Sequence, residues 1–86
     1  MKLELELAVT LKDGLLDPQG KTVLEALPTM GWSNVSEVRV GKLVRLTLDA
    51  DDETAGRAQA EEIGRRLLAN PVIEDVRVLE VREAGV

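Results

Sequence analysis

Residues 3–11 read LELELAVTL, an unbroken alternation of apolar with polar or small side chains. A period of two residues predicts a β-strand, because successive side chains of a strand point to opposite faces. The apolar face consists of Leu3, Leu5, Leu7, Val9 and Leu11. The other face carries Glu4 and Glu6. A strand with one packed and one solvated face is typical of an antiparallel sheet.

A helix is predicted to begin shortly after this strand. Asp17 occupies the position of an N-cap, and Pro18 follows at the first helical position, where its missing N–H costs nothing. The apolar residues that then recur at helical spacing are Val23, Leu24, Leu27 and Met30. Pro28 removes a helical hydrogen bond and is expected to end the regular helix a turn before Gly31.

Residues 35–49, VSEVRVGKLVRLTLD, predict two strands joined by a tight hairpin. A loop of three residues, 41–43, pairs Val40 with Val44 and Val38 with Leu46. All four apolar side chains then lie on one face, whereas a two-residue loop would place a charged side chain there.

Residues 52–69 are predicted to form the second helix. Acidic residues 51–53 lie at its positive end and two arginines, 65 and 66, near its negative end. A row of mostly small residues would let this helix approach a sheet closely. The row consists of Gly56, Ala60, Gly64 and Leu68, flanked by Ile63 and Leu67. Asn70 and Pro71 predict its end.

The last strand, residues 72–83, changes phase within its length. Val76 and Val78 alternate in one phase, and Leu79 and Val81 in the other. Such a change predicts a β-bulge, or a strand whose two halves pack against different bodies, of which the second could be another subunit.

These elements predict an α+β fold of the ferredoxin-like β-α-β-β-α-β order, with both helices on one face of an antiparallel sheet. The usual sheet order places the first strand between the third and fourth, which brings Glu4 and Glu6 beside Arg45 and Arg77. With 86 residues, the chain is expected to form one domain, residues 1–86.

The composition excludes most chemistry and several partners. The chain contains no histidine and no cysteine, so it lacks imidazole bases, imidazole metal ligands and thiolates. A net charge of −5 and a single aromatic residue, Trp32, argue against nucleic acid. No apolar run reaches the roughly 18 residues that cross a bilayer. A cytoplasmic binding module without membrane contact is therefore expected.

Four features that resemble ligand sites have simpler explanations. Residues 14–22, GLLDPQGKT, exceed the spacing of a P-loop by one residue, and Asp17 would face the phosphate. Asp13 and Asp17 offer too few oxygens for calcium. The acidic residues 49–53 are explained by the positive end of a helix, and Trp32 by covering the end of the first helix. We expect no cofactor and no metal on this chain.

Three local motifs, taken in order, resemble those of a known family. LDPQGKTV lies at the first helix start, VRVGK in the hairpin, and LLANPVIEDVRV across the junction of second helix and last strand. Together they resemble the PurS-type small subunit of phosphoribosylformylglycinamidine synthase, over essentially the whole chain. Two departures are the lack of an aromatic residue near Val76 and the presence of Pro28.

The resemblance implies a non-catalytic subunit of purine biosynthesis. In that family a glutaminase subunit releases ammonia, and a synthetase subunit that uses ATP and Mg²⁺ consumes it in a carbon–nitrogen ligase reaction. The small subunit is a homodimer that bridges the two and assists ammonia transfer. The partner contacts expected on this basis are Asp17, Gln19, Gly20, Lys21, Gly41, Lys42, Asn70 and Glu74.

Two other classes share the predicted fold, and fold alone does not choose among them. An ACT-like module that senses amino acids is the main alternative, since a glycine turn follows the first strand. An acylphosphatase-like enzyme needs an anion-binding arginine early in the chain, and the first arginine here is Arg39.

Overall fold

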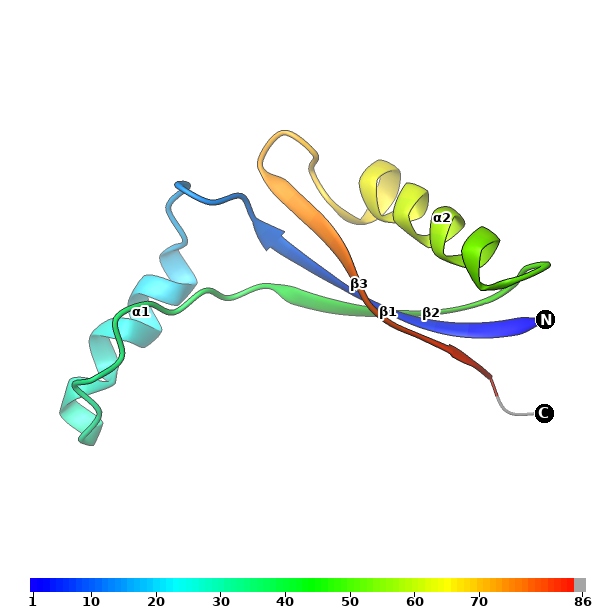
Figure 1. The fold of residues 1–86 in the computed structure, drawn as a ribbon. Coiled ribbons are helices and arrows are strands. Elements are labelled where there is room, and N and C mark those ends of the chain that lie inside the picture. The colour runs from blue at the N-terminus through cyan, green and yellow to red at the C-terminus, as the bar shows by residue number, and fades with distance from the viewer. Residues whose placement is uncertain (85–86) are drawn as a thin grey trace.

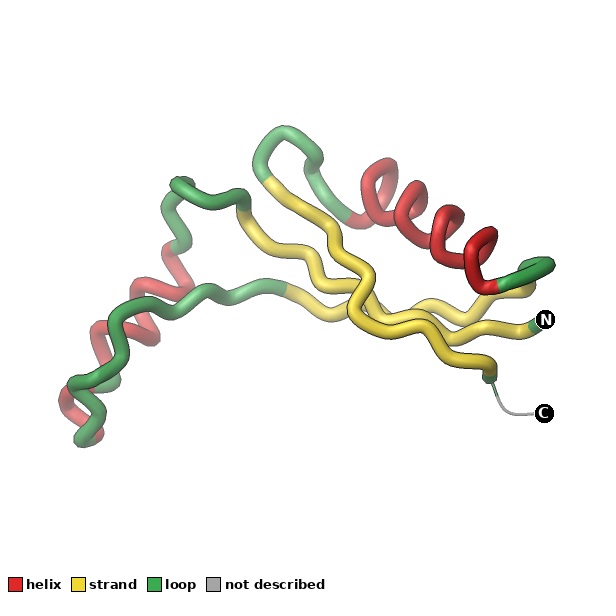
Figure 2. Tube along the Cα trace, in the orientation of Figure 1, coloured by secondary structure: helices red, strands yellow, loops and turns green. Residues whose placement is uncertain are grey.

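The computed structural model describes residues 1–84, which form three strands and two α-helices (Figures 1 and 2). The elements are β1 (Lys2–Leu11), α1 (Pro18–Ala26), β2 (Lys42–Asp49), α2 (Glu53–Ile63) and β3 (Glu74–Glu83). A 3-10 turn, Pro28–Met30, follows α1, and a π-helical turn, Gly64–Leu68, continues α2. No helix within residues 1–84 has the length and apolar character needed to cross a membrane.

The sheet is antiparallel, with strand order β2-β1-β3. β1 is the central strand, as predicted, and α2 lies along one face of the sheet (Figure 1). Leu3, Leu5, Leu7 and Val9 are almost completely buried. Ala60 of α2 joins Leu3, Leu5 and Leu7 in the core cluster. The α+β class and the packed face of the first strand are therefore confirmed.

The predicted bulge lies in β3. Glu6 is opposite Glu80, whereas the next residue of β1, Leu7, is opposite Val78. Leu79 is therefore the extra residue, and its side chain is half exposed. The extra residue shifts the alternation of side chains by one position. Val78 and Val81, on either side of the bulge, therefore both face the core.

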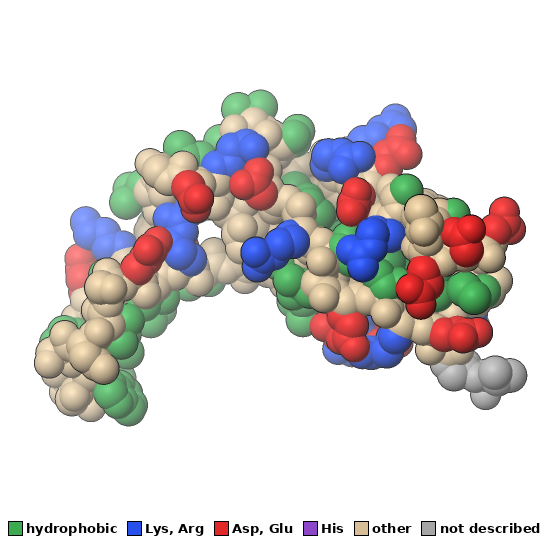
Figure 3. All heavy atoms as spheres, viewed as in Figure 1, with side chains coloured by type: hydrophobic (Ala, Val, Ile, Leu, Met, Phe, Trp, Pro, Cys, Tyr) green, Lys and Arg blue, Asp and Glu red, His purple; other side chains and the backbone are tan. Residues whose placement is uncertain are grey.

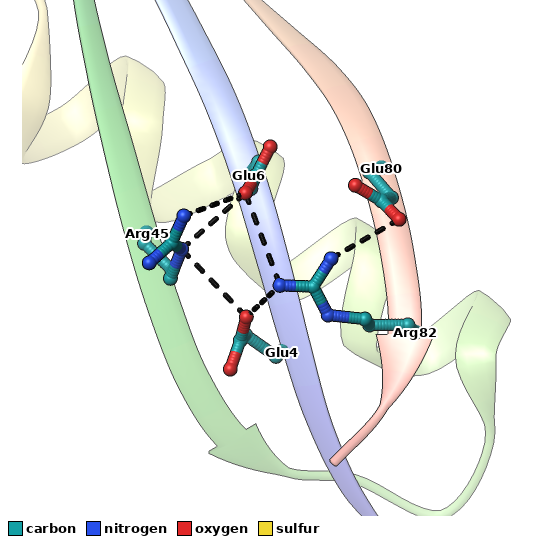
Figure 4. Close-up of polar contacts among 5 residues, drawn as sticks. All are labelled: Glu4, Glu6, Arg45, Glu80 and Arg82. Carbon is teal, nitrogen blue, oxygen red and sulfur yellow. Dashed lines mark hydrogen bonds and ion pairs between the residues drawn. The ribbon is translucent and has the colours of Figure 1, made fainter.

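The open face of the sheet carries a cluster of ion pairs around Glu4 and Glu6 (Figure 4). Arg45 of β2 pairs with both carboxylates, as predicted, and its contact with Glu6 is 3.0 Å long. Arg82 of β3 lies beside the same two carboxylates from the other side. The prediction that Arg77 would be the second neighbour is wrong, because Arg77 is opposite Ala8.

The predicted hairpin does not form in the described residues. Residues 32–41 belong to no strand, and β2 begins at Lys42. The physical reason lies in the backbone of Val40, whose N–H donates to the Asp17 carboxylate and not to a neighbouring strand. The sheet therefore has three strands where the sequence predicted four.

The prediction that both helices cover one face is correct only for α2. α1 projects away from the sheet, and the chain returns beside it (Figure 1). We call this projection, residues 13–41, the arm. The radius of gyration of the described chain is 16.3 Å. A compact chain of this length would have about 12 Å, so the arm makes the molecule markedly extended.

The helix ends follow local chemistry, with one exception. Pro28 ends the regular part of the first helix as predicted, and Gly31 closes the turn with φ of 99°. A side chain at Gly56 would collide with Leu3, and one at Gly64 would lie 2.6 Å from Val76, so the small residues do permit close packing. The exception is the π-helical turn, which leaves Leu67 exposed although its spacing predicted packing.

Candidate functional site

The carboxylate of Asp17 joins two segments of the chain. Its Oδ1 accepts a hydrogen bond of 2.9 Å from the Gly20 N–H, which caps α1 as predicted. Its Oδ2 accepts one of 2.7 Å from the Val40 N–H. These two hydrogen bonds hold the pKa of Asp17 below its usual value, because they stabilise the charged form. Asp17 therefore anchors the returning segment as well as the helix.

Two glycines allow the chain segments at this point to approach closely. A side chain on Gly20 would collide with the carbonyl oxygen of Val38 and lie 2.8 Å from Asp17 Oδ2. A side chain on Gly41 would lie 2.6 Å from the carbonyl oxygen of Val9. Both colliding oxygens belong to the backbone, which cannot move aside as a flexible side chain would. Only glycine fits these two positions without displacing the chain.

Arg39 makes a second set of contacts in the same place. Its Nη1 donates to the carbonyl of Leu15 at 3.1 Å, and its Nη2 donates to those of Leu11 and Lys12 at 3.1 and 3.2 Å. Sequence reasoning noted Arg39 only as the first arginine of the chain. The signal for its contacts is weak, because the three carbonyls lie 24–28 residues away.

A hollow of about 360 Å³ lies between the start of the arm and the ends of the three strands. Its lining consists of Val9, Leu11, Asp17, Pro18, Gln19, Val40, Gly41, Lys42 and Glu74. We call this hollow, with its lining residues, the root pocket. The structure thus brings together residues from all three motifs of the sequence.

Five of the eight predicted contact residues line the root pocket: Asp17, Gln19, Gly41, Lys42 and Glu74. Gly20 does not line the pocket, but its N–H donates to the carboxylate of Asp17, which does. Asn70 is linked to the pocket through Glu74, whose carboxylate accepts a 2.8 Å hydrogen bond from the Asn70 N–H. Lys21 is exposed on α1 and does not line the pocket.

The lining of the root pocket combines apolar and polar side chains. Val9 and Leu11 are among its apolar lining residues, and Gln19, Lys42 and Glu74 are among its polar ones. Asp17 is 7% exposed and its carboxylate already accepts from the Gly20 N–H at the start of α1 and from the Val40 N–H, so neither amide is offered to a phosphate. Residues 1–84 hold no group of three or more acidic side chains placed to bind a metal ion.

Comparison with known proteins identifies the family. The family model PurS, phosphoribosylformylglycinamidine (FGAM) synthase, matches residues 4–82. This span contains every residue of the root pocket. The chain belongs to the PurS family. Family membership favours the resemblance to a PurS-type small subunit over the alternative of an ACT-like amino-acid sensor.

Individual PurS proteins match over most of their length. The phosphoribosylformylglycinamidine synthase subunit PurS of Bacillus subtilis is 44% identical over 75 residues, which cover 87% of each chain. The structure of Thermus thermophilus PurS aligns with a TM-score of 0.86 and 35% identity, over 99% of this chain and 100% of that one. A chain in the structure of PurLQS from Thermotoga maritima aligns with a TM-score of 0.80 and 26% identity, over 98% and 99% of the two chains.

Proposed function

We propose that this chain is the small subunit of a phosphoribosylformylglycinamidine synthase complex in purine biosynthesis. The observation that carries the proposal is the match of residues 4–82 to the PurS family model. The likeness to a chain of the Thermotoga maritima PurLQS structure supports assembly with larger subunits, since 98% of this chain aligns with it.

The proposed role is structural and not chemical. A glutaminase subunit releases ammonia, and a synthetase subunit that binds ATP and Mg²⁺ converts formylglycinamide ribonucleotide to formylglycinamidine ribonucleotide. The chain, as one domain in the cytoplasm, bridges these partners and assists the transfer of ammonia. Its lack of histidine and cysteine is consistent with a subunit that leaves catalysis to others.

The root pocket and the arm are the proposed docking surface. The pocket is lined by apolar and polar side chains together, a combination that suits a protein partner. Apolar side chains gather along one edge of the arm, while charges of both signs are mixed over the body of the molecule (Figure 3). The exposed apolar residues of the arm are Leu15, Leu16, Val23, Met30, Trp32 and Val35.

We also propose that the chain forms a homodimer or a higher oligomer. Leu79, at the bulge of β3, is a half-exposed large apolar side chain outside the arm. A second copy packed there would remove Leu79 from water and stabilise so small a domain.

The test is the mass of the assembly. Native mass spectrometry of the chain mixed with the glutaminase and synthetase of the same organism should show a species that contains all three. Formation of this species should require both the glutaminase and the synthetase. The species should be lost when the chain carries Gln19→Ala and Lys42→Glu together. Masses of the separate components alone, at micromolar concentration, would contradict the proposal.

A further inference from the structure

Among residues 1–84, the arm contacts the rest of the molecule only at its root. Within residues 1–84, α1 packs against the 3-10 turn that follows it and contacts neither a strand nor α2. Two segments cross the root: residues 12–17 leave β1, and residues 38–41 return to β2 (Figure 2). The direction of the arm therefore depends on the bonds between these two segments.

Arg39, on the returning segment, donates two hydrogen bonds to the outgoing segment and one to Leu11, the last residue of β1. Its guanidinium spans the outgoing segment, from the carbonyl of Leu11 at the end of β1 to that of Leu15 before α1. The planar fork of an arginine holds two or more acceptors in a fixed geometry, which the single ammonium of lysine does not. The neighbouring Val40 N–H donates to the carboxylate of Asp17, the last residue of the outgoing segment.

These bonds influence the direction of the arm more than the stability of the fold. Arg39 and its contacts are exposed, so water can replace the guanidinium at each carbonyl when the side chain is removed. The core of the sheet lies elsewhere, around Leu3, Leu5 and Leu7. Loss of the fork would thus leave a folded sheet with an arm whose direction is no longer fixed.

We propose that Arg39 is a positioning residue, whose contacts with three carbonyls fix the direction of the arm so that the root pocket and α1 meet the partner subunits as one preformed surface. The inference rests on the proposed function and adds to it a residue outside the predicted contact set. Preformed geometry matters because a mobile arm must be ordered when a partner binds, which weakens the complex.

The isolated protein allows the first test, since Trp32 is its only aromatic residue and reports on the arm. Its backbone N–H donates to the carbonyl of Leu27, which ties it to the end of α1. Fluorescence anisotropy decay of Trp32 should show a faster component in Arg39→Met and in Arg39→Lys than in the wild type. Arg45→Met is the matched control, because Arg45 pairs with carboxylates on the open face of the sheet.

Hydrogen exchange supplies a second readout at the root. Exchange of the Val40 amide should become about tenfold faster in both Arg39 variants, the ratio that corresponds to one lost charge-assisted hydrogen bond. The exchange of amides in β1 should stay as in the wild type. Unchanged anisotropy and unchanged Val40 exchange in Arg39→Met would overturn the inference.

The reconstituted complex tests the second part of the inference, that the fixed arm matters for binding the partner subunits. Glutamine-dependent activity should fall about fivefold or more in Arg39→Met, the smallest change usual for coupling between sites, while ammonia-dependent activity changes less than about twofold. Arg39→Lys should restore little, because the fork is what matters. Full glutamine-dependent activity in a variant with a loosened arm would overturn the positioning role. If the wild-type chain itself gives no stimulation, the proposed function fails, and the inference fails with it.

Discussion

Gly20→Ala tests the close packing at the root of the arm. The new methyl group would lie 2.8 Å from Asp17 Oδ2 and closer still to the carbonyl oxygen of Val38, whereas ordinary contacts begin near 3.4 Å. The Val38 oxygen belongs to the backbone, so relief requires movement of the returning segment as a whole. That movement would strain the hydrogen bond from Val40 to Asp17.

The expected magnitude follows from two opposed effects. Overpacking of this kind costs up to about 3 kcal/mol. Alanine gains up to about 1 kcal/mol over glycine within a helix, and Gly20 lies in the first turn of α1. The net loss is about 2 kcal/mol, which corresponds to a fall in Tm of about 8–16 °C for a domain of this size.

Thermal unfolding followed by circular dichroism at pH 7 measures this loss. Glu25→Ala is the control, because Glu25 is exposed on the same helix. This substitution also introduces an alanine, with its high helix propensity, but at a position where no collision is expected. The control should melt within about 3 °C of the wild type. A Gly20→Ala variant that melts at the wild-type temperature, or above it, would refute the close approach of Val38 and with it the packing of the root.

Three further predictions concern the same surfaces. Hydrogen bonds from Gly20 and Val40 lower the pKa of Asp17 from its ordinary 3.8 in the folded protein, so the stability that this carboxylate contributes is present above that value and is lost as the pH falls through the lowered pKa. The difference in Tm between wild type and Asp17→Ala should therefore shrink in melts below about pH 4, and a difference that stays constant to about pH 2 would contradict this. Gln19→Ala and Lys21→Glu should leave melting almost unchanged but reduce glutamine-dependent more than ammonia-dependent activity, and equal loss of both activities would place the damage at the synthetase. Leu79→Asp should weaken self-association in light scattering while circular dichroism stays unchanged, and a wild-type monomer at tens of micromolar would count against the interface.

Local chemistry made much of the fold predictable. The alternating run of β1 determines its buried face, and the pair Asp17-Pro18 determines where α1 starts, because both depend only on nearby residues. The bulge at Leu79 was visible as a change of phase. In each case the cause and the effect lie within a few positions of each other.

The arm was not predictable, because its course depends on contacts between distant residues. The sequence predicts that Val38 and Val40 pair with β2, and their alternation is equally compatible with an extended segment beside α1. Asp17 decides between these arrangements by accepting the Val40 N–H from 23 residues away. The role of Arg39 was missed for the same reason, since its three acceptors are backbone carbonyls, which every residue carries.

The predicted contact residues were found by a different route. Motif resemblance selected them, and the structure places five of the eight around the root pocket. Physical reasoning on the sequence explained Asp17 as a cap but gave no reason for Asp17 and Glu74 to line one pocket. Their proximity arises from the arm, which brings the first and second motifs to the start of β3.

The most direct test of the account is the ratio of glutamine-dependent to ammonia-dependent synthesis of formylglycinamidine ribonucleotide. The glutaminase and synthetase of the same organism are assayed with and without this chain, at saturating ATP and Mg²⁺. The chain should raise the glutamine-dependent rate by about tenfold or more and leave the ammonia-dependent rate within about twofold, because the proposed role concerns assembly and ammonia transfer and not the chemistry at the synthetase. An unchanged ratio would contradict it.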